Sequence, residues 1–155
     1  MLRIHEIVSA FEAVAPLALQ ESYDNSGLIV GEMGAQVSKA LLCLDSTEAV
    51  VDEAIAKGCD LIVAHHPIVF GGLKQFTGGD YVQRALIKAI RNNIAIYACH
   101  TNLDNVAAGV NKALADKIGL HNLRILAPKS GILKKLVTLC PTQHADAVRT
   151  ALFNA

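Results

Sequence analysis

The sequence contains 155 residues, of which 52% are hydrophobic, and its 14 basic residues balance its 14 acidic residues. This length and composition predict one folded domain with a hydrophobic core and exclude a disordered chain. The zero net charge disfavours nucleic acid as a partner, because phosphate binding requires clustered basic residues. The apolar runs are short and the amino terminus lacks a signal-peptide pattern, so we expect no membrane helix and a cytoplasmic location.

Apolar residues within 3–15 recur at spacings of three and four, which predicts an amphipathic helix that ends near Pro16. Its expected buried face consists of Ile4, Ile7, Val8, Phe11 and Val14. A polar cluster at 20–27 then leads into a short strand at 28–31. The composition of Asp24-Asn25-Ser26-Gly27 favours a simple turn, and a contribution to a functional site is the alternative.

Two β-strand–helix–β-strand units follow. The first runs from a strand at 40–45 to a strand at 60–64, through a helix that Ser46 or Thr47 caps and Gly58 ends. Its expected inward side chains are Val50, Val51, Ala54 and Ile55. The second unit continues through a glycine-rich loop at 70–79 to a strand at 94–99. Its helix is expected to bury Val82, Ala85, Leu86, Ala89 and Ile90.

These two units predict an α/β fold in three layers, helix–sheet–helix, around a mostly parallel mixed sheet. A further helix is expected from Asn105 to about Ile118, and Gly119 would end it. Its expected inward face consists of Val106, Val110, Ala113 and Leu114.

A boundary is expected within residues 120–131, which combine loop, a short strand, Pro128, Ser130 and Gly131. Beyond it, the pattern predicts a strand at 135–141 and a helix that Thr142 caps and that runs through Phe153. We therefore expect an amino-terminal α/β domain at 1–127. Residues 128–155 are expected to be the start of a second α/β domain that is incomplete here.

The four cysteines stand singly in apolar surroundings, so we expect reduced core residues at Cys43, Cys59, Cys99 and Cys140. A nucleophilic pair of Cys99 with His100 is disfavoured, because neighbouring side chains of a strand diverge and apolar surroundings raise the pKa of a thiol. The separate histidines His5, His121 and His144 are expected to be ordinary surface residues.

Four metal-competent side chains follow two predicted neighbouring strands. His65, His66 and Pro67 end one strand, and His100 and Asp104 follow the other. A single histidine at a strand end is more often only a hydrogen-bonded terminus. Here the carboxyl ends of parallel strands meet where open α/β sheets bind ligands, which favours a metal site. Imidazole and carboxylate suit Zn, Fe, Mn, Ni or Co. A two-metal site would need further ligands. The role of His100 has three alternatives: a metal ligand, a group that orients a ligand, or a proton carrier.

Three segments in this order resemble the Nif-three-like dinuclear-metal proteins, also described as GTP cyclohydrolase I type 2 homologues. They are Glu21 to Gly31, Asp60 to Pro67, and His100 to Asp104 with Gly109-Val110-Asn111. The resemblance covers roughly residues 1–127. It implies that His65 and His66 each bind one ion and that Asp104 bridges the two ions.

The resemblance also implies further ligands from a His-x-x-x-Glu motif near the family's carboxyl terminus, which this sequence does not contain. Residues 133–153 resemble the opening of the domain that longer members insert, so the chain is expected to be the first part of a longer protein. The family implies a toroidal homohexamer and a hydrolytic reaction with a small molecule, for example a purine nucleotide such as GTP, in which His100 moves the proton. The alternatives are a non-catalytic, metal-stabilised scaffold or regulatory protein, and a bare structural α/β module.

Overall fold

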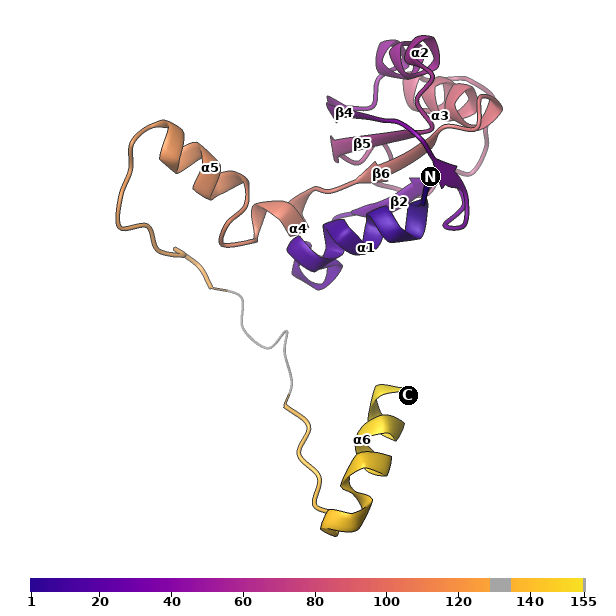
Figure 1. The fold of residues 1–155 in the computed structure, drawn as a ribbon. Coiled ribbons are helices and arrows are strands. Elements are labelled where there is room, and N and C mark those ends of the chain that lie inside the picture. The colour runs from indigo at the N-terminus through magenta and orange to yellow at the C-terminus, as the bar shows by residue number, and fades with distance from the viewer. Residues whose placement is uncertain (129–134, 155) are drawn as a thin grey trace.

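A four-stranded sheet in the order β2-β6-β5-β4 forms the centre of the protein, in a computed structural model that describes residues 1–128 and 135–154. β4 (Ala40–Asp45), β5 (Leu61–His66) and β6 (Ala95–Ala98) run parallel, and β2 (Gly27–Val30) runs antiparallel to β6. Helices lie on both sides of this sheet (Figure 1). The predicted three-layer α/β fold with a mostly parallel mixed sheet is confirmed.

The alternation of side chains along the strands divides the core between the two faces of the sheet. On one face, Leu61 and Val63 pack with Ile4 and Val8 of α1 (Ile4–Val14). On the other face, the strands pack against α2 (Glu48–Lys57) and α3 (Tyr81–Arg91). This second cluster contains Ile62, Ile96, Val51, Ala54, Ala85, Leu86 and Ala89. Complete burial of one such aliphatic side chain contributes about 1.5–3 kcal/mol before cavity effects.

Local signals set the ends of α2 as expected. The Thr47 side chain accepts a hydrogen bond from the Val50 amide, so Thr47 rather than Ser46 caps the helix. Gly58 ends the helix in the left-handed region, with φ of 63°.

Some side chains that were expected to face the core are exposed. Val14 is 63% exposed, whereas Ala15 is buried. Because each helical residue advances about 100°, Ala15 stands about 20° from Ile4 around α1 and Val14 about 80°. Two further expected core residues, Ile55 and Ile90, are also exposed.

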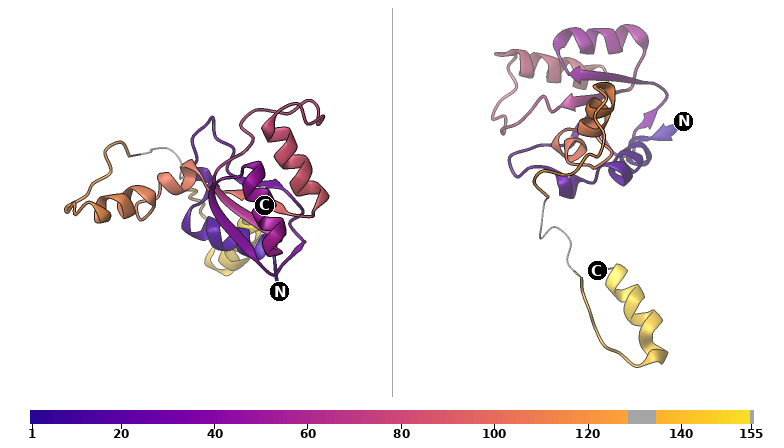
Figure 2. Two further views of the ribbon diagram at one scale, coloured as in Figure 1. Left: turned by 90° about the horizontal axis from the view of Figure 1, so that it is seen from above. Right: turned by 90° about the vertical axis from the view of Figure 1, so that its left-hand side faces the viewer.

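The prediction of a single helix that begins at Asn105 is wrong about where the helix begins. The chain instead forms a short helix α4 (Thr101–Asp104) and a second helix α5 (Val110–Lys117). The Asn105 side chain donates to the Leu19 carbonyl at 2.8 Å, which ties the intervening turn to the segment before β2. α5 projects from the sheet (Figures 1 and 2), and its expected inward residues Val110 and Leu114 are exposed.

Two short strands, β1 (Leu2–Arg3) and β3 (Gln36–Val37), pair antiparallel and were not predicted. Residues 135–141 form no strand, because no strand pairs with them in the described parts of the chain. Residues 120–128 contain no strand either. Ser130 and Gly131, expected at the boundary, lie outside the described residues. The helix expected after Thr142 is present as η2 (Thr142–His144) followed by α6 (Ala145–Phe153).

The four cysteines are free, as expected, but not all of them are buried. Cys59 and Cys99 are buried and Cys43 is half-buried. Cys140 is exposed, because it lies in the unpaired segment 135–141. Within the described residues, no helix has the length and apolar character needed to cross a bilayer.

Gly31 follows β2 directly and has φ of 119°, and a Cβ atom there would lie 2.7 Å from the Cβ atom of Ala95. We expect Gly31→Ala to lower the free energy of unfolding by about 2–4 kcal/mol, because backbone strain adds to overpacking. Gly58→Ala is the matched control, since Gly58 also has positive φ but no heavy atom would lie within 4 Å of its Cβ atom. It should cost only about 1 kcal/mol. Equal losses in urea unfolding would contradict the packing argument.

Candidate metal centre

The carboxyl ends of β5 and β6 carry the residues named from the sequence. β5 continues through both histidines instead of ending at Ala64, and His66 pairs with Asp45 of β4. His100 precedes α4, and Asp104 is the last residue of that helix. Asp104 therefore returns toward the strand ends on a helical turn.

The three histidines lie together at this edge of the sheet. Their ring centroids are separated by 4.9 Å for His65 and His66, 5.2 Å for His65 and His100, and 5.5 Å for His66 and His100. One ligand atom from each lies within 4.8 Å of the others, so this group can hold a metal ion. An Asp104 carboxylate oxygen lies 3.7 Å from Nε2 of His65. The structure thus brings all four residues together, and their individual roles stay predictions.

Each imidazole places its Nδ1 atom against a hydrogen-bond acceptor. The acceptors are the Cys99 carbonyl for His65 at 3.0 Å, the Asp45 carboxylate for His66 at 2.8 Å, and the Asp24 carboxylate for His100 at 2.8 Å. A carbonyl oxygen only accepts, so Nδ1 of His65 carries a hydrogen, and in the neutral imidazole Nε2 keeps its lone pair. Such contacts typically orient metal-binding histidines. The donor set therefore fits a divalent transition metal.

Asp24 is the most enclosed acid of the site, and its side chain is 0% exposed. Burial of the carboxylate acts to raise the pKa of Asp24. The hydrogen bonds from Thr101, His100, Ser26 and the Asn25 backbone together outweigh that effect and hold the pKa well below its usual range. Asp24 is therefore ionised at neutral pH.

Asn102 holds the start of α4 in place. Its Oδ1 atom accepts from the His100 amide at 2.9 Å, and its Nδ2 atom donates to the Ala15 carbonyl at 2.7 Å. The Asn102 side chain is completely buried. These bonds link the backbone of His100 to the end of α1, which limits how far the imidazole can move.

Asp45 is the functional candidate that sequence reasoning missed, and Asp24 lies in a segment for which a functional contribution was the less favoured alternative. The contact of Asp24 with His100 favours that alternative over a simple turn. No local pattern distinguishes it from a turn residue. Asp45 did carry a signal, since it ends a parallel strand at the same edge as His66.

The remaining histidines and Cys99 agree with expectation. His5, His121 and His144 are exposed. Burial raises the pKa of the Cys99 thiol, which disfavours a thiolate nucleophile.

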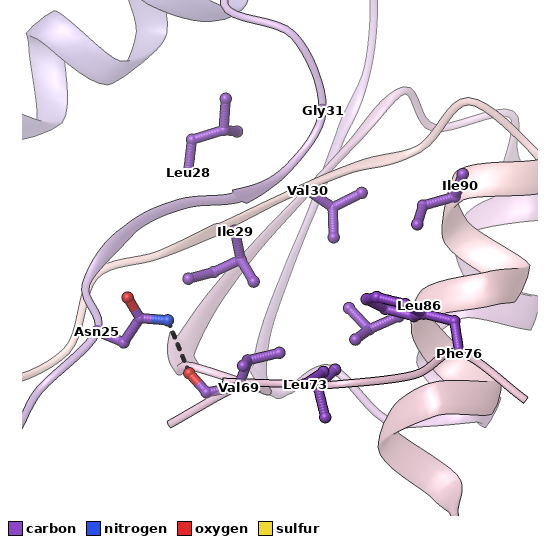
Figure 3. A pocket seen from close by; sticks show the side chains of 10 residues that line it. All are labelled: Asn25, Leu28, Ile29, Val30, Gly31, Val69, Leu73, Phe76, Leu86 and Ile90. Atoms are coloured by element: carbon purple, nitrogen blue, oxygen red, sulfur yellow. Dashed lines mark hydrogen bonds between the residues drawn. The ribbon is translucent and has the colours of Figure 1, made fainter. Parts of the chain in front are cut away.

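A separate hollow of about 530 Å³ lies between β2, the loop after β5 and α3. Figure 3 shows its mainly aliphatic lining and the hydrogen bond from Asn25 to the Val69 carbonyl at one end. Ile90 of α3 lines this hollow, which explains its exposure. None of the three clustered histidines lines it.

The model of the Duf34/NIF3 (NGG1p interacting factor 3) family matches residues 2–152. The chain belongs to the Duf34/NIF3 family. The three segments that carried the resemblance all lie within this match. Two of them supply the clustered histidines and Asp104.

Curated Duf34/NIF3 relatives are named GTP cyclohydrolase 1 type 2 homolog. The protein of Halalkalibacterium halodurans is 41% identical over 150 residues, covering 96% of this chain and 40% of the relative. That of Bacillus subtilis is 39% identical over 151 residues, covering 97% of this chain and 40% of the relative. The chain thus spans about two-fifths of their length.

Solved structures share the fold. A Bacillus cereus protein related to NIF3 matches with a TM-score of 0.77 and 40% identity, covering 97% of this chain and 42% of that one. Reduced HcgD from Methanocaldococcus jannaschii matches with a TM-score of 0.72 and 34% identity, covering 78% of this chain and 48% of that one. This Duf34/NIF3 chain therefore has the fold of its family over most of its length.

Proposed function

We propose that this chain forms part of a dinuclear metal-dependent hydrolase that acts on a nucleotide, such as GTP, or a related small molecule. The observation that carries the proposal is the convergence of His65, His66 and His100 beside Asp104 at the carboxyl edge of a parallel sheet. When bound, two divalent ions of Zn, Fe, Mn, Ni or Co supply an activated water and a Lewis acid. The names of the curated relatives support the nucleotide class.

In this proposal, His65 and His66 would each hold one ion, and Asp104 would serve as a ligand shared by both ions. The other ligands come from outside these residues, consistent with relatives that are more than twice as long. His100 accepts or returns the proton that moves during hydrolysis, because its ring lies within 5.5 Å of both other imidazole centroids.

The family resemblance further supports a homohexamer. Residues 1–127 would form the metal-binding domain, and residues 128–155 would begin an inserted domain. The greater length of the curated relatives agrees with this division.

A panel of nucleotides and phosphoesters tests the proposal with the purified protein and added Mn²⁺, Zn²⁺ or Fe²⁺. We expect metal-dependent hydrolysis of at least one nucleotide, and loss of that rate in His66→Ala. His121→Ala is the matched control, because His121 is exposed and lies outside the cluster. Metal binding without turnover across the panel would favour the scaffold or regulatory alternative.

A further inference from the structure

The Asp24 carboxylate is surrounded by hydrogen-bond donors. Its Oδ1 atom accepts from Nδ1 of His100 at 2.8 Å and from the Asn25 amide at 2.7 Å. Its Oδ2 atom accepts from the Ser26 hydroxyl at 2.8 Å, from the Thr101 amide at 3.0 Å and from the Thr101 hydroxyl. Three of these five contacts come from residues 76 or 77 positions away in the chain.

This arrangement exceeds what a turn requires. An Asx turn needs only a hydrogen bond between the side chain and the chain's own backbone two residues on, and therefore no contact with a distant residue. The contacts with His100 and Thr101 instead attach the segment before β2 to the start of α4. The resulting bond to His100 is buried on the carboxylate side, and the imidazole side chain is only 15% exposed.

We propose that Asp24 is a positioning residue that holds His100 in one tautomer, with the hydrogen on Nδ1 and the lone pair on Nε2. An ionised carboxylate only accepts hydrogen bonds, so the nitrogen that faces Asp24 must carry the hydrogen. Nε2 is then the proton-accepting atom of the ring. This inference rests on the proposed function, in which His100 moves a proton.

Long-range ¹⁵N–¹H NMR of the histidine rings tests the proposal directly. Spectra are recorded on the metal-free protein at about pH 8, above the usual histidine pKa of about 6.5. We expect the Nδ1–H form to dominate for His100. Asp24→Ala removes the acceptor and should abolish that dominance.

Asp24→Asn provides a second variant of nearly unchanged size. The Oδ2 side receives three donors against two on the Oδ1 side, so the amide oxygen should occupy the Oδ2 side. The amide NH₂ group then donates to Nδ1 of His100 and moves the ring hydrogen to Nε2. Dominance of Nε2–H in the unmodified protein, or an unchanged Nδ1–H form in both variants, would overturn the inference.

Two control variants separate tautomer control from general stabilisation. Thr101→Val removes one donor to Oδ2 but keeps the contact between Asp24 and His100, so stability should fall while the Nδ1–H form persists. Asp45→Asn should alter the tautomer of His66 and leave His100 unchanged. A loss of the Nδ1–H form in Thr101→Val would show that Asp24 acts only through local stability.

The tautomer is read without metal or substrate, so its result is independent of the hydrolysis panel. An Nδ1–H form without turnover would uphold the role of Asp24 and reject the hydrolase. Turnover together with a dominant Nε2–H form of His100 would reject the role of Asp24 and uphold the hydrolase.

Discussion

Replacing His65 with alanine is expected to lower the affinity of the protein for Zn²⁺ by at least about 100-fold. Loss of a residue that merely orients a ligand typically costs 10–100-fold, so loss of a ligand should reach at least the upper end of that range. His65 is well placed for this role, because its Nδ1 contact with the Cys99 carbonyl leaves Nε2 beside Asp104. Competition with a chelator of known affinity measures the effect.

Asp104→Ala should weaken Zn²⁺ binding in the same assay, since its carboxylate lies 3.7 Å from Nε2 of His65. His121→Ala should leave the affinity unchanged, because His121 is exposed and outside the cluster. Equal affinities for the unmodified protein and both site variants would place any bound zinc elsewhere and reject the proposed centre.

Asp24→Ala is expected to lower the free energy of unfolding by about 3–5 kcal/mol at neutral pH. Removing one partner of a buried charged network leaves the other groups without their acceptor. Here those groups include Nδ1 of His100 and the amide of Thr101. Urea unfolding measures the loss. Asp52→Ala is the control, since the Asp52 carboxylate is 60% exposed in its ion pair with Lys88 and should contribute at most about 1 kcal/mol.

The contribution of Asp24 should also depend on pH. Its pKa is lower in the folded than in the unfolded protein, so the unfolded state binds more protons as acid is added. The stabilisation is therefore present above the unfolded pKa of about 3.9 and declines as the pH falls further. The difference in stability between the unmodified protein and Asp24→Ala should shrink below about pH 4. A constant difference down to pH 2 would contradict the assignment of a depressed pKa.

The sequence by itself determined the layered α/β fold, because its signals are local. Apolar spacing marks the helices, and Thr47 and Gly58 mark the ends of α2. Two adjacent strand–helix–strand units require a parallel sheet, and its geometry brings His65 and His66 to the same edge as His100. The candidate cluster therefore followed from strand order and from the polar residues at the strand ends.

Tertiary structure alone decided the surroundings of that cluster. Asp24 and His100 are 76 positions apart, and a turn composition says nothing about so distant a partner. Distant contacts also account for the break between α4 and α5, where the Asn105 side chain bonds to the Leu19 carbonyl. Residues 135–141 have the sequence pattern of a strand but form none, because no strand pairs with them among the described residues. Local periodicity specifies which residues can form a helix or strand. Contacts between distant segments specify where an element ends and which carboxylate lies beside a histidine.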